Sequence, residues 1–310
     1  MFNDLFKTCK FCGSQSLNTF EASERMFGIG GRFTYSECAD CKSVQLDQVP
    51  PNLSDYYSRS GYYSFLPLVQ SGLARRVFKK IRMGLFLATN AKVFEPSYGY
   101  WLKKLAPGYQ TKIADVGCGN GQLLYEMYAS GYTDLHGFDP FMEEDLKVNA
   151  NLYLWKQRIE ESDTSFDLIM MHHAFEHMES PMEVLQTSFD KLSPGGKLLI
   201  RTPVTDGEIW REKREFWVQL DAPRHLVIPS VSGFEMLSKA IGFDLYEVLF
   251  DSTAFQFWGT ELYERGFSLD PKLRDELYSQ EEIALLEEKA LHYNEEGKGD
   301  QVCFFLRKPL

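Results

Sequence analysis

The chain has 310 residues, 44% of them apolar and 15% aromatic, which is enough for one large domain with a sizeable core and a smaller module beside it. Its formal net charge of −11 argues against a broad nucleic-acid-binding surface, since such surfaces are basic. No apolar run reaches the roughly 18 residues that a transmembrane helix needs, and residues 1–10 lack the apolar core of a secretory leader. We therefore expect a cytoplasmic protein with no transmembrane segment and no nucleic-acid partner.

Two cysteine pairs mark the first 50 residues. Cys9 and Cys12 are separated by two residues, as are Cys38 and Cys41, and 25 residues lie between the pairs. This spacing is typical of a zinc ribbon, in which two tight turns supply four thiolates to a tetrahedral Zn²⁺. Four thiolates leave no open position for substrate, so the site would be structural. Redox-active dithiols are the alternative. We predict a zinc-ribbon module over residues 1–50.

Residues 51–108 are rich in aromatic side chains and show no strand alternation, which predicts a helical cap or linker. Apolar residues recur at helical spacing over Ser71–Thr89. The segment also carries five cations, and no acid occurs between Tyr56 and Phe94; the cations are Arg75, Arg76, Lys79, Lys80 and Arg82. Three interpretations stay open: a solvated helix face, a patch for a phosphate-bearing substrate, or a weak contact with a membrane surface.

A glycine-rich turn follows the apolar segment Lys112–Val116, which predicts a buried strand, and precedes Gln122–Tyr128, which predicts a helix. Glycines there permit positive φ and let a ligand approach the main chain, toward which the first helical N–H groups point. The spacing G-x-G-x-G, with an acid two residues earlier, differs from the dinucleotide fingerprint G-x-G-x-x-G and favours a ligand with a positive charge. The residues concerned are Asp115, Gly117, Gly119 and Gly121.

Further strands alternate with helix-length segments, which predicts a parallel sheet covered on both faces, with ligands at the carboxyl ends of its strands. The strands are expected at 134–139, 151–155, 166–171, 197–201, 243–250 and 302–307. Helices are expected at 182–192, 231–240 and 279–293, and Ser193–Gly196 is expected to be a turn. Asp139 lies 24 residues after Asp115, which suits an acid that binds ribose hydroxyls.

Five motifs, in their order and spacing, resemble those of class I S-adenosylmethionine-dependent methyltransferases: Asp115–Gly121, Gly137–Pro140, Ser165–Leu168, Phe175–His177 and Leu192–Gly196. The resemblance implies an enzyme with S-adenosylmethionine as methyl donor and a doubly wound Rossmann-like α/β fold with a seven-stranded sheet, its last strand antiparallel. This domain would span 109–310, with a substrate loop at 205–229 and a helical insertion at 251–300. The implied cofactor-binding residues are Asp115, Gly117, Cys118, Gly119, Gly121, Asp139, Pro140, Ile159 and His172, although Gln157–Glu160 departs from the family's usual adenine signature.

The cysteine module and the segment Asp221–His225 narrow the resemblance to methyltransferases of bacterial sugar and surface-glycan pathways. That resemblance implies methylation of a sugar or nucleotide sugar at carbon or oxygen. The alternatives are a quinone or lipid-like acceptor, a nucleic acid, or an inactive module that binds S-adenosylmethionine.

A nucleophile of high pKa also needs a general base, and histidine suits neutral pH. We expect His225, in the loop 205–229, to be that base, with a capping role as the alternative. His177, beside Glu176, is the next candidate. Since this Glu-His pair recurs in the family across many substrates, it could instead shape the pocket. His136 and His292 are expected to be structural.

Overall fold

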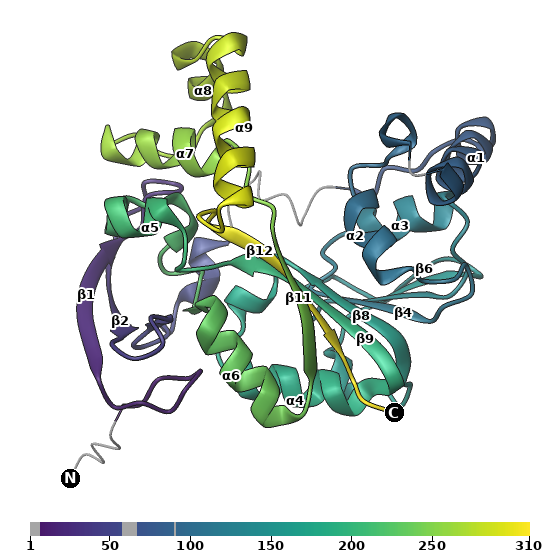
Figure 1. The fold of residues 1–310 in the computed structure, drawn as a ribbon, viewed down its shortest axis with the longest axis horizontal. Helices are drawn as coiled ribbons and strands as arrows, with labels where there is room; N and C mark the ends of the chain where they lie inside the picture. Colours follow the sequence, from purple (N-terminus) through teal and green to yellow (C-terminus); the bar gives the residue numbers. More distant parts are fainter. Residues whose placement is uncertain (1–6, 58–66, 90) are drawn as a thin grey trace. The chain divides into compact units, whose positions relative to one another are not determined.

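The computed structural model describes residues 7–57, 67–89 and 91–310 (Figure 1). Its contacts divide the chain into two compact units. The first unit comprises the described residues of Met1–Arg59 together with Phe175–Leu185 and Arg201–Phe304, and the second comprises those of Ser60–Ala174 with Gln186–Ile200 and Phe305–Leu310. Each unit therefore combines stretches that lie far apart in the sequence.

The large sheet has the strand order β11-β12-β9-β8-β4-β5-β7-β6. Strand β4 is parallel to β5 and β8, and β5 is parallel to β7, as the strand-helix alternation predicts. All four residues of β4 are buried, as expected in a sheet covered on both faces. The bounds are β4 (Ile113–Val116), β5 (Leu135–Phe138), β6 (Leu146–Asn149), β7 (Leu152–Trp155), β8 (Phe166–His172), β9 (Leu192–Pro203), β11 (Asp244–Phe250) and β12 (Gln301–Arg307).

The α/β Rossmann-like fold class is confirmed, and so is the antiparallel last strand. The Gly195 N–H donates to the Lys308 carbonyl and the Val204 N–H to the Asp300 carbonyl, at 3.1 and 2.9 Å. Residue numbers rise along β9 as they fall along β12, so the two strands are antiparallel. Among the described residues the sheet has one strand more than expected, because β6 pairs antiparallel with β7 at its edge. This strand escaped prediction because it is short and partly exposed.

The predicted turn at Ser193–Gly196 is wrong in one respect, since β9 already begins at Leu192. Gly195 adopts a positive φ of 75°, so the chain does bend there. However, the Lys308 N–H donates to the Gly196 carbonyl at 2.9 Å. The hydrogen bonds between the two strands thus continue through the bend. They are made by Lys308, which is far from Gly196 in the sequence, so the local pattern could not predict them.

The predicted helices are confirmed to within a few residues. In the second unit, α3 begins directly after the glycine turn and packs on β5 and β7. In the first unit, Ser230 caps α6 by accepting a hydrogen bond from the Gly233 N–H at 2.9 Å, and Gly242 ends it at φ 107°. The bounds are α1 (Leu73–Thr89), α2 (Gly99–Leu105), α3 (Gln122–Ala129), α4 (Pro181–Lys191), α5 (Glu208–Lys213), α6 (Val231–Ile241), α7 (Phe255–Glu264), α8 (Pro271–Leu277) and α9 (Gln280–Glu295). Short 3-10 turns occupy Leu53–Tyr56, Lys92–Phe94, Ile159–Glu161, Phe175–His177, Arg214–Phe216 and Val218–Leu220.

A smaller sheet lies in the first unit, with the order β1-β2-β3-β10. Three of its strands come from the cysteine-rich segment, whereas β10 comes from the loop predicted at 205–229. Tyr35 on β2, Trp210 on α5 and Trp217 belong to one buried cluster that this sheet shares with α7 and α9. The N-terminal module therefore does not form a core alone. The bounds are β1 (Leu17–Ser23), β2 (Arg32–Cys38), β3 (Val44–Leu46) and β10 (Val227–Ile228).

Candidate functional site

In the second unit, parallel pairing brings the carboxyl ends of β4, β5, β7 and β8 to the same edge of the sheet. The glycine turn leaves β4, and Asp139 follows β5 directly. The Gly119 N–H donates to Asp139 Oδ2 at 3.0 Å, and the Gly117 N–H donates to the Phe138 carbonyl at 2.8 Å. The structure thus joins the turn and the acid that the sequence predicts as parts of one cofactor site.

Glycine is required in this turn for two reasons. Gly117 and Gly121 have φ of 74° and 77°, a region that side chains with a Cβ rarely enter. A Cβ on Gly117 would lie 2.5 Å from the Ala174 side chain, and one on Gly121 would lie 2.5 Å from Leu154. The turn is therefore packed closely against its neighbours, and only glycine fits at these two positions.

Asp115 lies at the end of β4 with only 3% of its surface exposed. Burial, and then the negative charge of Asp139, raise the pKa of its carboxyl to about 8. A buried acid in this state gains stability from a nearby cation. The aminocarboxylate end of S-adenosylmethionine carries an ammonium group and its sulfur is positively charged, so the donor set fits this cofactor.

The remaining predicted cofactor residues lie on the same strand ends or close to them. Burial raises the pKa of the Cys118 thiol, which keeps it neutral. Pro140 is exposed directly after Asp139, and Ile159 is buried in a 3-10 turn after β7. His172 ends β8, and its ring centre lies 4.9 Å from that of Trp101.

Trp101 and the backbone at His173 were not predicted. Trp101 is buried on α2. The segment around it contains many aromatic residues, so nothing in the sequence distinguishes Trp101 from the others. His173 follows β8 at φ 52°, a strained region for a residue with a side chain. Such strain is often found where a chain positions functional groups.

Three polar side chains form a second cluster, in the first unit. Glu176, His177 and His225 each place one potential ligand atom within 4.8 Å of the others. The two imidazole rings are 4.8 Å apart between centroids and nearly perpendicular. The Glu176 carboxylate is fully buried and accepts a hydrogen bond from Thr202 Oγ1 at 3.0 Å. The rival base candidates of the sequence thus belong to one cluster.

Hydrogen bonds to carbonyl oxygens fix the tautomers of both histidines. His177 Nδ1 lies 2.9 Å from the Arg224 carbonyl, and His225 Nδ1 lies 2.7 Å from the Gln219 carbonyl. A carbonyl oxygen can only accept, so each Nδ1 carries a proton. In their neutral forms both rings therefore keep a lone pair on Nε2, the atom that could accept a proton.

Burial, and then His177, lower the pKa of His225 to about 4, so that it is neutral at physiological pH. Only 6% of its surface is exposed. Its main-chain carbonyl accepts a hydrogen bond from the Tyr35 hydroxyl at 2.9 Å. The loop around this residue is therefore a packed part of the first unit.

A buried ion network supports this loop. The Arg224 side chain is completely buried and donates to both oxygens of Asp221, at 2.6 and 2.9 Å, and to Glu24 at 3.1 Å. Although burial alone would raise the pKa of Asp221, the Arg224 guanidinium holds it below its usual value. The network thus links the loop to Glu24, directly after β1.

Tyr57 and Glu24 belong to this site, and sequence reasoning missed both. The Tyr57 hydroxyl lies 3.0 Å from His177 Nδ1 and 3.2 Å from the Arg224 carbonyl. Glu24 lies 200 residues from Arg224 in the chain. The sequence pointed to the segment Asp221–His225, which contains Arg224, the residue that both Tyr57 and Glu24 contact. It gave no indication of Tyr57 or Glu24 themselves.

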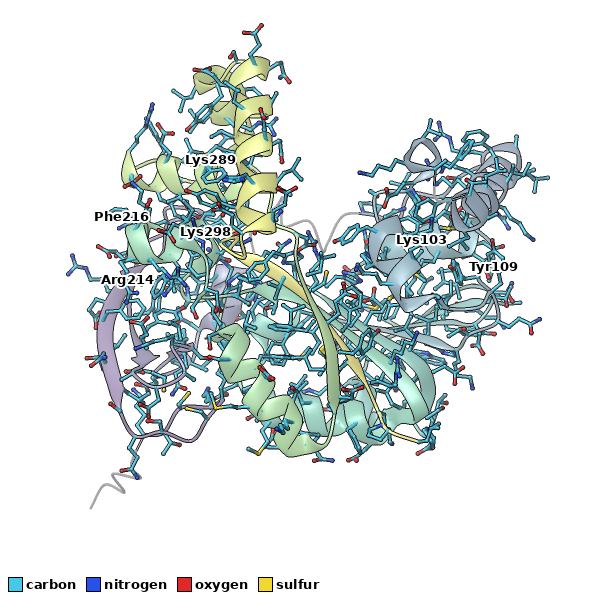
Figure 2. All side chains as sticks on the ribbon, in the orientation of Figure 1. Lys103, Tyr109, Arg214, Phe216, Lys289 and Lys298 are labelled. Atoms are coloured by element: carbon cyan, nitrogen blue, oxygen red, sulfur yellow. The ribbon has the colours of Figure 1, made fainter. Side chains whose placement is uncertain are left out.

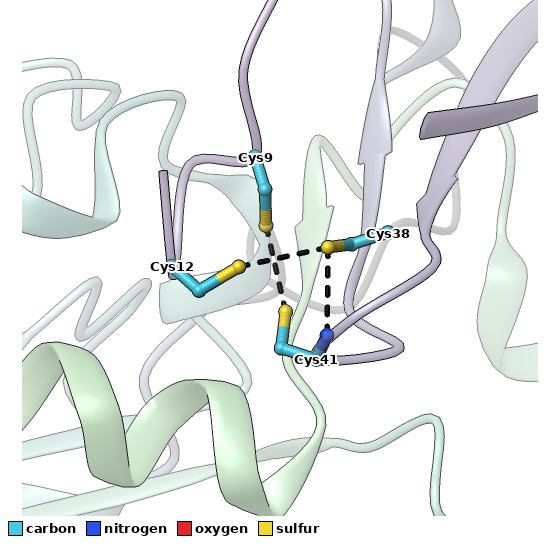
Figure 3. A group of neighbouring side chains, drawn as sticks. All are labelled: Cys9, Cys12, Cys38 and Cys41. Atoms are coloured by element: carbon cyan, nitrogen blue, oxygen red, sulfur yellow. Dashed lines mark hydrogen bonds between the residues drawn. The ribbon is translucent and has the colours of Figure 1, made fainter. Parts of the chain in front are cut away.

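The four predicted metal ligands form a compact cluster, also in the first unit (Figure 3). Cys9 Sγ lies 3.5 Å from Cys41 Sγ, and Cys12 Sγ lies 3.6 Å from Cys38 Sγ. Four sulfurs about 2.3 Å from a tetrahedral Zn²⁺ would lie about 3.8 Å apart. Backbone N–H groups also point at the sulfurs, from Phe11 to Cys9 and from Cys41 to Cys38. The cluster is consistent with a structural zinc site.

Comparison with known proteins gives a family. A family model described as a methyltransferase domain matches residues 88–248. Across the described part of the chain, no helix combines the length and the apolar character needed to cross a membrane.

Two relatives carry the same name, tRNA U34 carboxymethyltransferase. The protein of Helicobacter acinonychis (strain Sheeba) is 26% identical over 71% of this chain and 88% of its own length. The protein of Helicobacter pylori (strain Shi470) is 26% identical over 48% of this chain, which spans only 62% of that relative. Among solved structures, the cyclopropane synthase MmaA2 from Mycobacterium tuberculosis has a TM-score of 0.43 at 18% identity, covering 75% of this chain and 83% of that one.

The relatives contradict two sequence predictions: the sugar or nucleotide-sugar acceptor, with its assignment to carbohydrate biosynthesis, and the absence of a nucleic-acid partner. The second inference rested on the net charge of −11. That charge is a sum over the whole chain and does not determine the potential at one site. The first rested on the cysteine module and the segment Asp221–His225, which the structure uses to hold the first unit together.

Proposed function

Because the chain belongs to the methyltransferase domain family and is a class I S-adenosylmethionine-dependent methyltransferase, we propose that its acceptor is a tRNA. The names of the curated relatives carry this proposal. Those names describe transfer of a carboxymethyl group, whereas the family description names methyl transfer. Either group would pass from a sulfonium to a nucleophile of the tRNA, but a methyl group comes from S-adenosylmethionine itself, whereas a carboxymethyl group needs a donor that carries it on sulfur. The experiment must therefore supply both donors.

The proposed cofactor contacts follow from the strand ends of the second unit. Asp115 would stabilise the positively charged part of S-adenosylmethionine, and Asp139 would bind its ribose hydroxyls. The main chain at Gly117, Cys118, Gly119 and Gly121 would approach the aminocarboxylate, with Pro140, Ile159 and His172 around the nucleoside. When bound, the cofactor supplies an electrophilic carbon on a sulfonium.

The proposed proton acceptors are the Nε2 atoms of His177 and His225. Their Nδ1–H bonds to carbonyl oxygens support this assignment, because they leave Nε2 free of a proton. Glu176 would favour the imidazolium that forms when either ring takes a proton. General-base catalysis of this kind contributes roughly 10²–10⁴-fold to the rate.

We further propose that Cys9, Cys12, Cys38 and Cys41 bind one structural Zn²⁺. The sulfur spacing and the N–H groups directed at the sulfurs support this proposal. Four thiolates around one ion leave no position for substrate. The ion would therefore stabilise the first unit and take no part in group transfer.

The decisive experiment incubates the purified protein and unmodified tRNA transcripts with one of two labelled donors: S-adenosylmethionine, or its sulfonium analogue that carries a carboxymethyl group in place of the methyl group. Label should enter tRNA and be released by ribonuclease, and mass spectrometry of the nucleosides should identify the added group and the modified base. Asp139→Asn serves as a variant with impaired cofactor binding. Label that stays out of RNA with both donors and every tRNA tested, while the protein binds S-adenosylhomocysteine, would refute a tRNA acceptor and leave the methyltransferase assignment intact.

A further inference from the structure

Helix α1 presents an apolar face to solvent. Residues four apart on a helix lie on the same side, and four such side chains are strongly exposed: Leu73 by 76%, Val77 by 52%, Ile81 by 58% and Leu85 by 40%. Phe78, exposed by 63%, widens the stripe. A helix on the surface of a water-soluble protein normally packs its apolar side against the core. The outward orientation of this apolar stripe therefore requires an explanation.

The opposite face of α1 is fixed on the second unit. Met83 and Phe86 are buried, and Lys103 Nζ lies 4.4 Å from the centre of the Phe86 ring. Lys103, which belongs to α2, is labelled in Figure 2. Lys79 pairs with Glu126 on α3 at 2.6 Å, and the Arg76 guanidinium lies over the Tyr128 ring at 4.6 Å. These contacts hold the helix so that its apolar stripe points outward.

The cations of α1 divide in the same way. Arg76 and Lys79 are occupied by α3, whereas Arg75 and Lys80 are exposed and Arg82 is partly exposed. None of these three forms an ion pair with another residue in the described ranges 7–57, 67–89 and 91–310. They stand on either side of the apolar stripe, and no acid occurs in α1.

We propose that α1 docks the protein onto an anionic lipid surface. An amphipathic helix with an apolar stripe and flanking cations lies in the interface, where the apolar side chains enter the acyl boundary and the cations meet lipid phosphates. Charge complementarity supports this occupant. The chain has a net charge of −11, but α1 carries only cations, so an anionic surface attracts this helix and repels the rest of the protein. The charge distribution would therefore orient the protein with α1 toward the lipid.

Two other occupants suit the face less well. An RNA would bind the cations, and Phe78 could stack on a base, but the four aliphatic side chains of the stripe would remain beside solvated phosphates without a partner. A second copy of the chain would cover the apolar stripe but would bring two sets of Arg75, Lys80 and Arg82 together, which is repulsive. The lipid surface satisfies both parts of the pattern.

The test is co-sedimentation of the full-length protein with vesicles of phosphatidylcholine, either pure or with about a quarter phosphatidylglycerol. We expect binding to the anionic vesicles and several-fold weaker binding to the neutral ones, with the difference reduced at high salt. The double variant Val77→Asp/Ile81→Asp should lose binding at least tenfold, and Arg75→Glu/Lys80→Glu should lose the preference for anionic lipid. Leu285→Asp/Leu291→Asp, on the exposed side of α9, is the matched control and should bind like wild type.

The altered side chains lie on the surface, so circular dichroism and binding of S-adenosylhomocysteine should be unchanged. Absence of sedimentation with anionic vesicles would overturn the proposal, as would equal binding of the Val77→Asp/Ile81→Asp variant. Loss of tRNA binding or of a dimer in that variant, without any vesicle binding by wild type, would assign the face to RNA or to a second copy instead. Transfer to tRNA is measured without vesicles, so it can fail or succeed independently.

Discussion

The imidazole rings of His177 and His225 lie 4.8 Å apart, nearly perpendicular, with each Nδ1 directed at a carbonyl oxygen of the loop 205–229. Two side chains that the sequence presents as rival bases thus lie side by side in one cluster. If the pair provides the general base, replacing either histidine should lower kcat, and the two replacements should lower it by different factors.

Replacing His225 by Asn is expected to lower kcat by about 10²–10⁴-fold while leaving the affinity for S-adenosylhomocysteine unchanged. His177→Asn should lower kcat as well, but together the two changes should cost less than the product of their separate effects, since the residues act as a unit. His292→Asn, on the exposed face of α9, is the control. Turnover by His225→Asn within about threefold of wild type would exclude His225 as the base.

The pH profile of kcat offers an independent test of the same residue. Because burial and His177 lower the pKa of His225 to about 4, its Nε2 stays unprotonated throughout the neutral range. If His225 is the base, kcat at saturating donor should remain flat from about pH 8 down to about pH 5 and fall only nearer pH 4. A fall in kcat centred near pH 6.5, the ordinary histidine pKa, would contradict this assignment.

Cofactor affinity should depend on pH through Asp115. Its pKa of about 8 in the free protein means that the carboxyl is largely protonated at neutral pH, whereas a bound cation favours the ionised form. Affinity should therefore rise with pH from about 6 to about 8, by at most tenfold per unit, and then level off. Calorimetry with S-adenosylmethionine, which carries both the ammonium group and the positively charged sulfur, in buffers of different ionisation enthalpy should show proton release. Asp115→Asn should bind more weakly and without pH dependence, and pH-independent binding by wild type would refute the role.

The glycine turn makes a steric prediction. Gly121→Ala would place a Cβ 2.5 Å from Leu154 at a φ of 77°, which combines backbone strain of about 1 kcal/mol with overpacking of about 1–3 kcal/mol. We expect a lower melting temperature and a large loss of cofactor affinity. Gly72→Ala, where a Cβ meets nothing within 4 Å, is the matched control and should change neither. Normal affinity in Gly121→Ala would show that the turn can relax.

The buried cation Arg224 should be a major determinant of stability. Arg224→Met leaves Asp221 and Glu24 without their partner, and removal of one member of a buried ion network costs about 3–5 kcal/mol of unfolding free energy. Arg211→Met breaks an exposed pair with Glu208 and should cost at most about 1 kcal/mol. Denaturant unfolding of both variants measures the difference. Equal losses would mean that the loop does not depend on its ion network.

Local patterns allowed much of this site to be predicted. The spacing of the cysteines and of the glycines after Asp115 reflects contacts between residues close in sequence, and the alternating strands and helices fix which strand ends meet. Contacts such as Arg224 with Glu24, or Tyr57 with His177, join residues 120 or more positions apart and leave no local pattern. The two-residue strand β10 is likewise too short to carry a periodic signal.

The acceptor could not be predicted for a different reason. The glycine turn is expected to bind the donor, which many enzymes of this fold share. The acceptor is bound by surface segments that differ from one enzyme of the fold to another. The predicted sugar acceptor rested on the cysteine module and the segment Asp221–His225. In the structure both stabilise the first unit, so their presence in the sequence carries no information about the substrate.

The pairing of β10 with β3 has a consequence for any shortened form of the protein. Val227 and Ile228 obtain their sheet partners from Gln45 and Val44, and the Ser230 hydroxyl that caps α6 also donates to the carbonyl of Cys41. A chain beginning after residue 50 would expose an unpaired strand edge and the indole rings of Trp210 and Trp217, and such surfaces aggregate. The cysteine module therefore completes the sheet and the core that hold the histidine-bearing loop. If the four thiolates bind the proposed Zn²⁺, a chelator should lower activity by unfolding this unit, although the ion itself takes no part in group transfer.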